Sequence, residues 1–444
     1  MKYLSHLGYK VAPFKIGPDF IDPGHHTKIC GKTSINLDSW MLSKNYNIEN
    51  FQKSSLNCDI AVVEGVMGLF DGISGTSEAG STAQMAKWLN LPVVLILDAR
   101  SMARSVAAIV QGFENFDKNL NIAGIIFNRV GSPNHYRYLK DAVKDNCKTE
   151  SLGYILRNEK ISLPDRHLGL VTAEEFTMSD ETLSLLVTMI DKNTSFKDFI
   201  HKLAPFSNNH YHVSDEGTRD KEVVNIGVAR DKAFCFYYKD NIELLKKSGA
   251  KIVEFSPLTD THLPDNLHGL YFGGGYPELF ANELSCNISL LKDINAESHG
   301  NMPIYGECGG FMFLCSFMTD ENGKKTYPMT GCFNFSVKVS SRLRSLGYRE
   351  ITLKQNSLIG SKGAVLRGHE YHYSTLLEDM SKKTFLDNDI KDIYNVTKRD
   401  GKTVDLSGFL KNNTLASYFH IHFGSNENCA KSFVKACLKY KSME

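Results

Sequence analysis

Residues 303–314 read PIYGECGGFMFL, which is an apolar run, a cysteine set between glycines, and a second apolar run. This pattern is typical of a strand that turns sharply into a helix, with the cysteine at the turn. Small neighbours permit the tight turn, and the helix N-terminus beside the sulfur is expected to lower the pKa of the thiol. Cys308 is therefore a candidate covalent nucleophile, and a buried structural cysteine is the alternative.

Two distant segments supply what such a nucleophile requires. Residues 270–275 read LYFGGG, a strand ending in glycines whose backbone N–H groups, with that of Gly309, are predicted to hold an oxyanion. Residues 416–423 read ASYFHIHF, an alternation typical of a strand, which predicts that His420 and His422 point to one face. Either imidazole is a candidate base for Cys308, and a pair of surface or metal-binding histidines is the alternative.

Composition indicates an ordinary globular enzyme. The 444 residues are 42% hydrophobic and carry a formal net charge of +1, so we expect two or three domains and neither nucleic acid nor a membrane as partner. The ten cysteines include no Cys-x-x-Cys pair, and no signal-peptide pattern opens the chain. We expect free thiols, a cytoplasmic location and a small-molecule substrate. The longest apolar run, residues 91–97, is too short for a membrane span and predicts a buried strand.

Apolar runs in the first half of the chain alternate with helical patterns, and they lie at 10–15, 59–63, 93–97 and 122–127. Their continuous rather than alternating apolar character predicts a parallel α/β sheet buried on both faces. Residues 207–221 are polar and without periodicity, which predicts a linker. The predicted organisation is therefore a first domain at 1–206 and a second α/β domain at 222–444.

The first domain contains candidate ligand-binding residues. Residues 59–65, DIAVVEG, bring Glu64 to the end of a strand, where such an acid commonly holds the Mg²⁺ of a nucleoside triphosphate; a helix cap is the alternative. Residues 15–24, KIGPDFIDPG, combine Lys15, which suits phosphate, with two carboxylates that suit Mg²⁺ or a substrate group; a polar turn is the alternative. Asn128 ends another strand and could offer its amide to a base edge.

A phosphate-binding loop should complete this arrangement, but the pattern Gly-x-x-x-x-Gly-Lys-Ser/Thr is not found. Residues 31–33, GKT, lack the required upstream glycine because His26 stands at that position. Met1 opens what looks like the second half of a helix, with no capping residue before it. We therefore expect a strand and a Gly-rich loop ahead of Met1, with a genuinely loopless protein as the alternative.

From about residue 4 to about residue 437, the chain resembles the cobyrinic acid a,c-diamide synthases, glutamine-dependent enzymes of corrinoid biosynthesis within the cobyrinate/cobyrate amidotransferase group. The matching motifs are PFKIGPDFIDPG (13–24), NLD (36–38), EGVMGLFDG (64–72), ARDKAF (229–234), GGYPE (274–278), GECGG (306–310), RGHEYHYS (367–374) and SYFH (417–420). The resemblance implies an α/β protein with two parts. The first is a P-loop domain of dethiobiotin-synthetase type that binds ATP and the tetrapyrrole, and the second is a class I glutaminase domain.

The resemblance also implies a glutaminase mechanism. Cys308 would attack the side-chain amide of L-glutamine, with His420 as base, to form a glutamyl thioester and release ammonia. The oxyanion would be held by Gly274, Gly275 and Gly309. In the other domain, ATP would phosphorylate the a- and c-acetate groups of cobyrinic acid, and ammonia would displace each phosphate.

Residue roles in the first domain follow from the same resemblance. Asp19, Asp22 and Glu64 match the family's acids for Mg²⁺, ATP and substrate activation, with Asp19 and Glu64 as the metal ligands. Lys15 would meet phosphate, and Asn128 would face the adenine.

Several alternatives stay open. The substrate could be a related tetrapyrrole, such as nickel sirohydrochlorin or hydrogenobyrinic acid. Without a phosphate loop, the chain could be a glutaminase that donates ammonia to another ATP-binding subunit, and a non-catalytic tetrapyrrole-binding protein is a third interpretation. A homodimer is an open expectation. His422 stands where many class I glutaminases have the third triad acid, which leaves open what orients His420.

Overall fold

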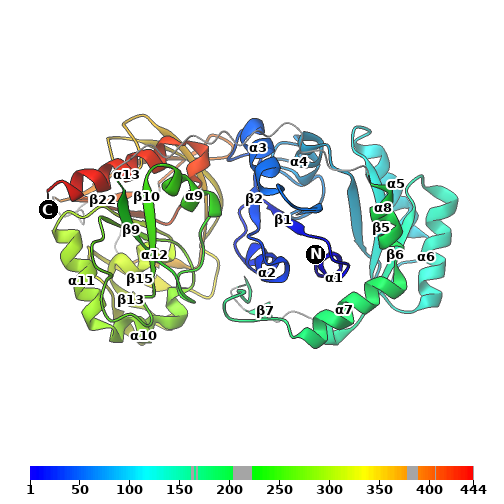
Figure 1. Ribbon diagram of the computed structural model, residues 1–444, viewed down its shortest axis with the longest axis horizontal. Helices are drawn as coiled ribbons and strands as arrows, with labels where there is room; N and C mark the ends of the chain where they lie inside the picture. The colour runs from blue at the N-terminus through cyan, green and yellow to red at the C-terminus, as the bar shows by residue number, and fades with distance from the viewer. Residues whose placement is uncertain (162–164, 167–168, 204–222, 378–388, 406, 444) are drawn as a thin grey trace. The chain divides into compact units, whose positions relative to one another are not determined.

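The computed structural model describes residues 1–161, 165–166, 169–203, 223–377, 389–405 and 407–443. The chain divides into two compact units, Met1–Val213 and Ser214–Glu444 (Figure 1). The predicted linker at 207–221 lies outside the described residues. Each unit is an α/β structure built on parallel strands, which confirms the predicted fold class.

The first unit contains two separate three-stranded parallel sheets. One has the order β2-β1-β3, formed by β1 (Val11–Ile16), β2 (Ile35–Leu37) and β3 (Ile60–Glu64). The other has the order β4-β5-β6, formed by β4 (Val93–Asp98), β5 (Ile122–Val130) and β6 (Ser151–Leu156). Each apolar run predicted from the first half of the chain corresponds to one of these strands.

Helices connect and cover these strands. They are α1 (Lys2–His6), α2 (Ile21–Cys30), α3 (Lys44–Ser54), α4 (Thr82–Leu89), α5 (Ser105–Phe116), α6 (Pro133–Asn146), α7 (Asp180–Asn193) and α8 (Phe196–Lys202), with the short elements η1 (Glu159–Ile161), β7 (Asp165–Arg166) and β8 (Gly169–Leu170). Serine side chains cap the N-termini of α3, α4, α6 and α7 by accepting from a backbone N–H three residues on. No helix among the described residues is long and apolar enough to cross a membrane.

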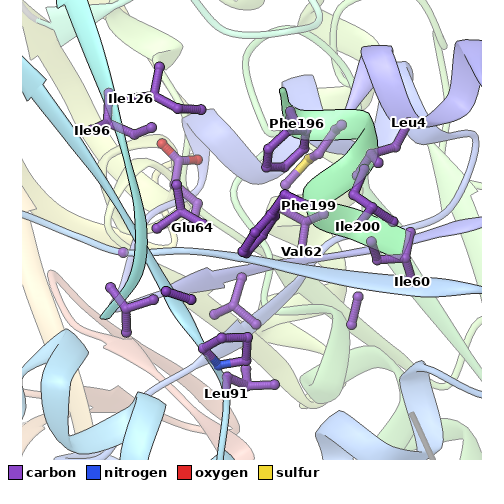
Figure 2. A pocket seen from close by; sticks show the side chains of 18 of the residues that line it. Leu4, Ile60, Val62, Glu64, Leu91, Ile96, Ile126, Phe196, Phe199 and Ile200 are labelled. Atoms are coloured by element: carbon purple, nitrogen blue, oxygen red, sulfur yellow. The ribbon is translucent and has the colours of Figure 1, made fainter. Parts of the chain in front are cut away.

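A cavity of about 1920 Å³ lies between β3 and β4, and within the described residues these two strands end their sheets without pairing. Figure 2 shows Val62 and Ile96 among the side chains that line this cavity. The prediction of a buried strand at residues 91–97 is therefore only half right. Leu95 is buried, but Ile96 is 60% exposed because its side chain faces the cavity.

The second unit is built on a seven-stranded sheet of order β10-β9-β11-β12-β23-β22-β19. The parallel strands are β9 (Val224–Ala229), β10 (Ala250–Phe255), β11 (Gly269–Phe272), β12 (Ile304–Glu307) and β23 (Thr414–Ser417), and the antiparallel edge is formed by β22 (Phe409–Lys411) and β19 (Ile390–Asp392). Neighbours along a strand face opposite sides, so on β11 Phe272 joins one apolar cluster and Tyr271 the other.

Helices and two further sheets complete the second unit. The helices are α9 (Lys239–Lys247), α10 (Ala281–Cys286), α11 (Ile288–His299), α12 (Gly309–Leu314) and α13 (Asn428–Lys441), with the 3₁₀ turns η2 (Pro277–Phe280) and η4 (Phe423–Ser425). One sheet has the order β14-β13-β15-β18, from β13 (Cys315–Thr319), β14 (Thr326–Pro328), β15 (Phe333–Val339) and β18 (Ser374–Leu376). The other has the order β21-β20-β16-β17-β24, from β16 (Ser345–Leu353), β17 (Val365–His372), β20 (Tyr394–Lys398), β21 (Thr403–Val404) and β24 (His420–Ile421).

Candidate active site

Cys308 occupies the turn between β12 and α12, as the strand–turn–helix pattern predicts. Its backbone has φ +48° and ψ −103°, a conformation that is strained for a residue with a side chain. The flanking glycines are sterically required: a Cβ built on Gly310 would lie 2.3 Å from the carbonyl oxygen of Phe272, and one on Gly306 would lie 2.6 Å from a methyl carbon of Leu314. The surrounding packing therefore holds the turn in place.

The Cys308 thiol is buried and donates to the carbonyl oxygen of Tyr371 over 3.8 Å. Burial raises the pKa of Cys308, and the negative charge of Glu278 adds to this, whereas the N–H of Gly309 opposes it. The prediction of a lowered pKa is wrong, because desolvation outweighs the contribution of the Gly309 N–H at the start of α12. Cys308 is therefore a thiol at neutral pH and needs a base to become a nucleophile.

The glycine loop after β11 lies against the turn at Cys308. A Cβ built on Gly309 would come within 3.2 Å of the backbone nitrogen of Gly275 and 2.9 Å of Pro277, so two of the predicted oxyanion donors are neighbours. The N–H of Gly274, by contrast, donates to the carbonyl oxygen of Phe236 over 3.2 Å. This corrects the prediction that Gly274 contributes its N–H to an oxyanion, because that donor is already used.

Gly274 instead makes room for an imidazole ring. A Cβ on Gly274 would lie 2.3 Å from Cε1 of His420, so the same loop that contacts Gly309 also contacts the candidate base. His420 is 2% exposed, and burial, with a smaller contribution from the charge of His372, lowers its pKa to about 3. At neutral pH His420 is uncharged and able to accept a proton.

His422 lies in a different environment, and the prediction that both imidazoles share one face is wrong. The strand pattern is interrupted because β23 ends at Ser417 in one sheet and β24 begins at His420 in another. Nδ1 of His422 accepts from the N–H of Gly424 over 3.1 Å, and Nε2 lies 3.6 Å from a carboxylate oxygen of Asp240. His422 is thus committed to contacts away from the glycine loop, which leaves His420 as the candidate base.

Four predicted residues of the first unit meet at the carboxyl ends of β1 and β3. Lys15 is 4% exposed, and its ammonium lies 2.5 Å from Asp22, 3.5 Å from Glu64 and 3.6 Å from Asp19. Burial alone would lower the pKa of Lys15, but the hydrogen bond to Asp22 and the charges of the carboxylates raise it. Lys15 is therefore a charged group surrounded by acids.

His26 belongs to this cluster, although in the sequence it stands out only as the residue that excludes a phosphate loop. Its Nε2 lies 2.6 Å from a carboxylate oxygen of Glu64. The signal that could have found it is helical spacing, since Asp22 and His26 are four residues apart on α2. Asn36 also has a definite place, because its side-chain amide donates to the carbonyl oxygen of Asp19 over 2.7 Å.

Asn128 lies apart from this cluster, at the carboxyl end of β5 in the other sheet. Its side-chain oxygen accepts from the N–H of Arg129 over 2.9 Å, and the Arg129 guanidinium lies 3.0 Å from Asp98. The structure brings these three residues together.

The acids around Lys15 suit Mg²⁺ in part. No group of three or more His, Cys, Asp or Glu side chains among the described residues is arranged to hold a metal by itself. Mg²⁺ is usually held by one or two carboxylates together with phosphate oxygens and water. Asp19 and Glu64, which lie 3.6 and 3.5 Å from the Lys15 ammonium, fit that partial role.

Comparison with known proteins gives matches over both units. Residues 1–171 match the CobQ/CobB/MinD/ParA nucleotide binding domain, and residues 225–428 match the CobB/CobQ-like glutamine amidotransferase domain. Cobyrinate a,c-diamide synthase of Leptospira interrogans serovar copenhageni is 42% identical over 436 residues, covering 98% of this chain and 93% of that protein. The enzyme of the same name from Listeria innocua is 40% identical over 433 residues, covering 96% and 92%. A solved structure of PurLQS from Thermotoga maritima covers 50% of this chain and all of its own, with 15% identity and a TM-score of 0.33.

Proposed function

Since this chain belongs to the cobyrinate a,c-diamide synthase family, we propose that it uses glutamine and ATP to amidate the a- and c-acetate carboxylates of cobyrinic acid. It is a glutamine-hydrolysing ligase with a nucleotide-binding domain and a glutamine amidotransferase domain. The observation that supports the proposal most directly is the glycine loop at 273–275, which contacts both the turn at Cys308 and the ring of His420. Amide hydrolysis needs a nucleophile, a base and backbone donors in one place.

In the glutaminase reaction, uncharged His420 takes the proton of the Cys308 thiol, and the thiolate attacks the side-chain amide carbon of glutamine. The N–H groups of Gly275 and Gly309 stabilise the oxyanion of the tetrahedral intermediate. The carbon–nitrogen bond then breaks as His420 returns the proton to the leaving ammonia. Water hydrolyses the resulting glutamyl thioester, with His420 again as base, and restores the thiol.

In the synthetase reaction, a substrate carboxylate attacks the γ-phosphorus of ATP, forming an acyl phosphate and releasing ADP. Ammonia then attacks the acyl carbon, and the carbon–oxygen bond to phosphate breaks. Lys15 binds phosphate oxygens, and Asn128 faces the adenine. Asp19 and Glu64 would hold Mg²⁺, which when bound neutralises phosphate charge, and Asp22 keeps Lys15 in position.

The test is formation of the diamide from cobyrinic acid with ATP and Mg²⁺, with either glutamine or an ammonium salt as nitrogen source. We expect Cys308→Ser to lose at least about a hundredfold of the glutamine-dependent rate and to keep the ammonium-dependent rate, because only glutamine hydrolysis needs the nucleophile. Cys315→Ser is the matched control, since Cys315 is also buried and directly follows α12. Full glutamine-dependent activity in Cys308→Ser would overturn the mechanism.

The same assay distinguishes the substrate. If cobyrinic acid is not amidated but nickel sirohydrochlorin or hydrogenobyrinic acid is, the reaction class stands and the substrate assignment fails.

A second candidate function is an ammonia donor that hydrolyses glutamine without amidating a substrate. The cavity between β3 and β4, which do not pair with each other among the described residues, favours it, because an interrupted sheet gives a poor foundation for a nucleotide site. Glutaminase activity with no ATP hydrolysis in the presence of cobyrinic acid would support this alternative, and corrinoid-dependent ATP hydrolysis would exclude it.

A further inference from the structure

A Cys–His pair needs something that fixes the imidazole relative to the sulfur. His422 lies against Asp240 and Tyr238. We propose that two buried side chains, Glu307 and Asn241, clamp the backbone beside His420 and thereby position its ring. This inference rests on the proposed glutaminase reaction. It assigns to both residues a positioning role that acts through His420.

Glu307 links the strand of the nucleophile to the strand of the base. It immediately precedes the nucleophile on β12, is 1% exposed, and accepts from the N–H of Ile421 over 3.0 Å. The hydroxyls of Tyr305 and Tyr271 donate to the same carboxylate over 2.8 and 3.0 Å. Since Ile421 immediately follows the base, this single side chain spans the two halves of the catalytic pair.

Asn241 holds the other side of the same residue. It projects from α9, is fully buried, and donates to the carbonyl oxygen of Ile421 over 2.8 Å. Its side-chain oxygen accepts from the N–H of Phe423 over 2.7 Å. Both backbone polar groups of Ile421 are therefore bonded to side chains, the N–H to Glu307 and the carbonyl oxygen to Asn241.

The geometry of β24 explains why side chains are needed. In an antiparallel pair, alternate residues point their N–H and C=O groups away from the partner strand. Among the described residues β24 pairs with β17 alone, through Gly368 with Ile421 and His369 with His420, so the outward groups belong to Ile421. The side chains of His369 and His420 are directly opposite each other across this pair, and their rings stack with centroids 4.8 Å apart. The clamp thus positions the ring by fixing its backbone, and the stack adds a contact to the ring itself.

Charge does not account for the role of Glu307. Burial raises the pKa of Glu307 to about 8. The three hydrogen bonds that its carboxylate accepts act in the opposite direction and lower this pKa. A carboxylate at this place raises the pKa of Cys308 further and so disfavours the thiolate. Burial and His372 are what lower the pKa of His420. The benefit of Glu307 is therefore positional.

The first test is steady-state glutaminase kinetics of Glu307→Leu, Glu307→Gln and Asn241→Ala. We expect kcat of Glu307→Leu and Asn241→Ala to fall about a hundredfold while KM for glutamine changes little, because a displacement near 1 Å costs about that much. Glu307→Gln keeps an acceptor for the N–H of Ile421, so its kcat should be at least about tenfold higher than that of Glu307→Leu. The control is Ser298→Ala, which removes a buried hydrogen bond to Thr414. Thr414 begins β23, whereas the chain leads to His420 from the other end of that strand, Ser417. An equal loss of kcat in Glu307→Leu and Glu307→Gln would overturn the proposal. So would a rise in KM for glutamine with no change in kcat.

A double substitution separates positioning from general destabilisation. In a His420→Ala background, Glu307→Leu should cause no further loss of kcat, because the residue that it positions is already gone. The same loss in both backgrounds would refute action through His420. If His420→Ala itself leaves glutaminase activity intact, the assignment of the base fails instead.

A readout independent of activity covers variants that fold but have little turnover. Amide hydrogen exchange of the segment 417–423 should become faster in Glu307→Leu and Asn241→Ala, but stay slow in Glu307→Gln and Ser298→Ala. Unchanged exchange in the first two variants would contradict the clamp even if the protein proves not to hydrolyse glutamine.

Discussion

At the scale of single residues, Cys308 and His420 have pKa values shifted by burial in opposite directions, and the chemistry depends on both shifts. Burial raises the pKa of the Cys308 thiol, so its uncharged form predominates at neutral pH. Burial lowers the pKa of His420 to about 3, so its uncharged form predominates at every pH above that value. The pair therefore begins as thiol and imidazole, and a proton moves only when a substrate carbonyl can stabilise the charge that follows.

We therefore expect Cys308 to react slowly with iodoacetamide between pH 6 and 8, at a rate that rises with pH without reaching a plateau. The reason is that the thiolate, which is the reactive form, becomes populated only as pH approaches the raised pKa. The measurement is the alkylation rate of Cys308, followed by mass spectrometry of its peptide. The exposed Cys286 provides the internal reference for an accessible thiol. A rate plateau at Cys308 below pH 7 would show that its thiolate is stabilised and would contradict the raised pKa.

At the scale of elements, the glycine loop after β11 joins the two halves of the glutaminase site through steric fit. A Cβ on Gly274 would overlap Cε1 of His420 at 2.3 Å, so Gly274→Ala must displace the ring. We expect this variant to lose at least about a hundredfold in glutaminase kcat while ammonium-dependent amidation is kept. The matched control is Gly300→Ala at the end of α11, where the nearest atom would lie 3.4 Å away.

Thermal unfolding of Gly274→Ala and Gly300→Ala decides whether the loss of glutaminase activity comes from a local displacement or from general destabilisation. A melting temperature for Gly274→Ala close to that of Gly300→Ala, together with lost turnover, supports displacement of the ring. Normal turnover in Gly274→Ala would show that the base lies elsewhere.

The same elements show which parts of the site a sequence can predict. The turn at Cys308 was predictable because glycines at 306, 309 and 310 are a local requirement of the backbone. The separation of His420 from His422 was not, because the alternating pattern gives no sign that the chain changes sheets after Ser417. Glu307 was also missed, since its partners come from β11, β12 and β24 and meet only in the folded unit.

In the first unit, local motifs predicted Lys15 and its three carboxylates but not that His26 joins them. Lys15, Asp19 and Asp22 lie within one motif, and Glu64 ends the neighbouring strand, so parallel pairing of β1 with β3 brings them together. The exposure of Ile96 could not be predicted. An apolar run shows that a strand prefers burial, but it does not show which other part of the chain covers that strand.

At the scale of the whole molecule, the two units differ in how completely their sheets are built. The second unit has a continuous seven-stranded sheet with an apolar cluster on each face. The first has two three-stranded sheets on either side of a cavity of about 1920 Å³, with Ile96 60% and Met67 74% exposed beside it. Apolar side chains that stay exposed to water gain no stabilisation from burial, so the first unit should be the less stable of the two.

We therefore expect calorimetry to resolve two transitions, with the first unit unfolding at the lower temperature. ATP with Mg²⁺ should raise only the lower transition, because a ligand stabilises the part of the chain that it binds, by about 2.7 kcal/mol at a hundred times its dissociation constant. A covalent glutamine analogue on Cys308 should raise only the upper one. Lys15→Met leaves Asp19, Asp22 and Glu64 without their shared cation. This variant should reduce the temperature at which the first unit unfolds and abolish the effect of nucleotide on that temperature. A single transition that responds equally to both ligands would show that the units unfold together and that their stabilities are not separable.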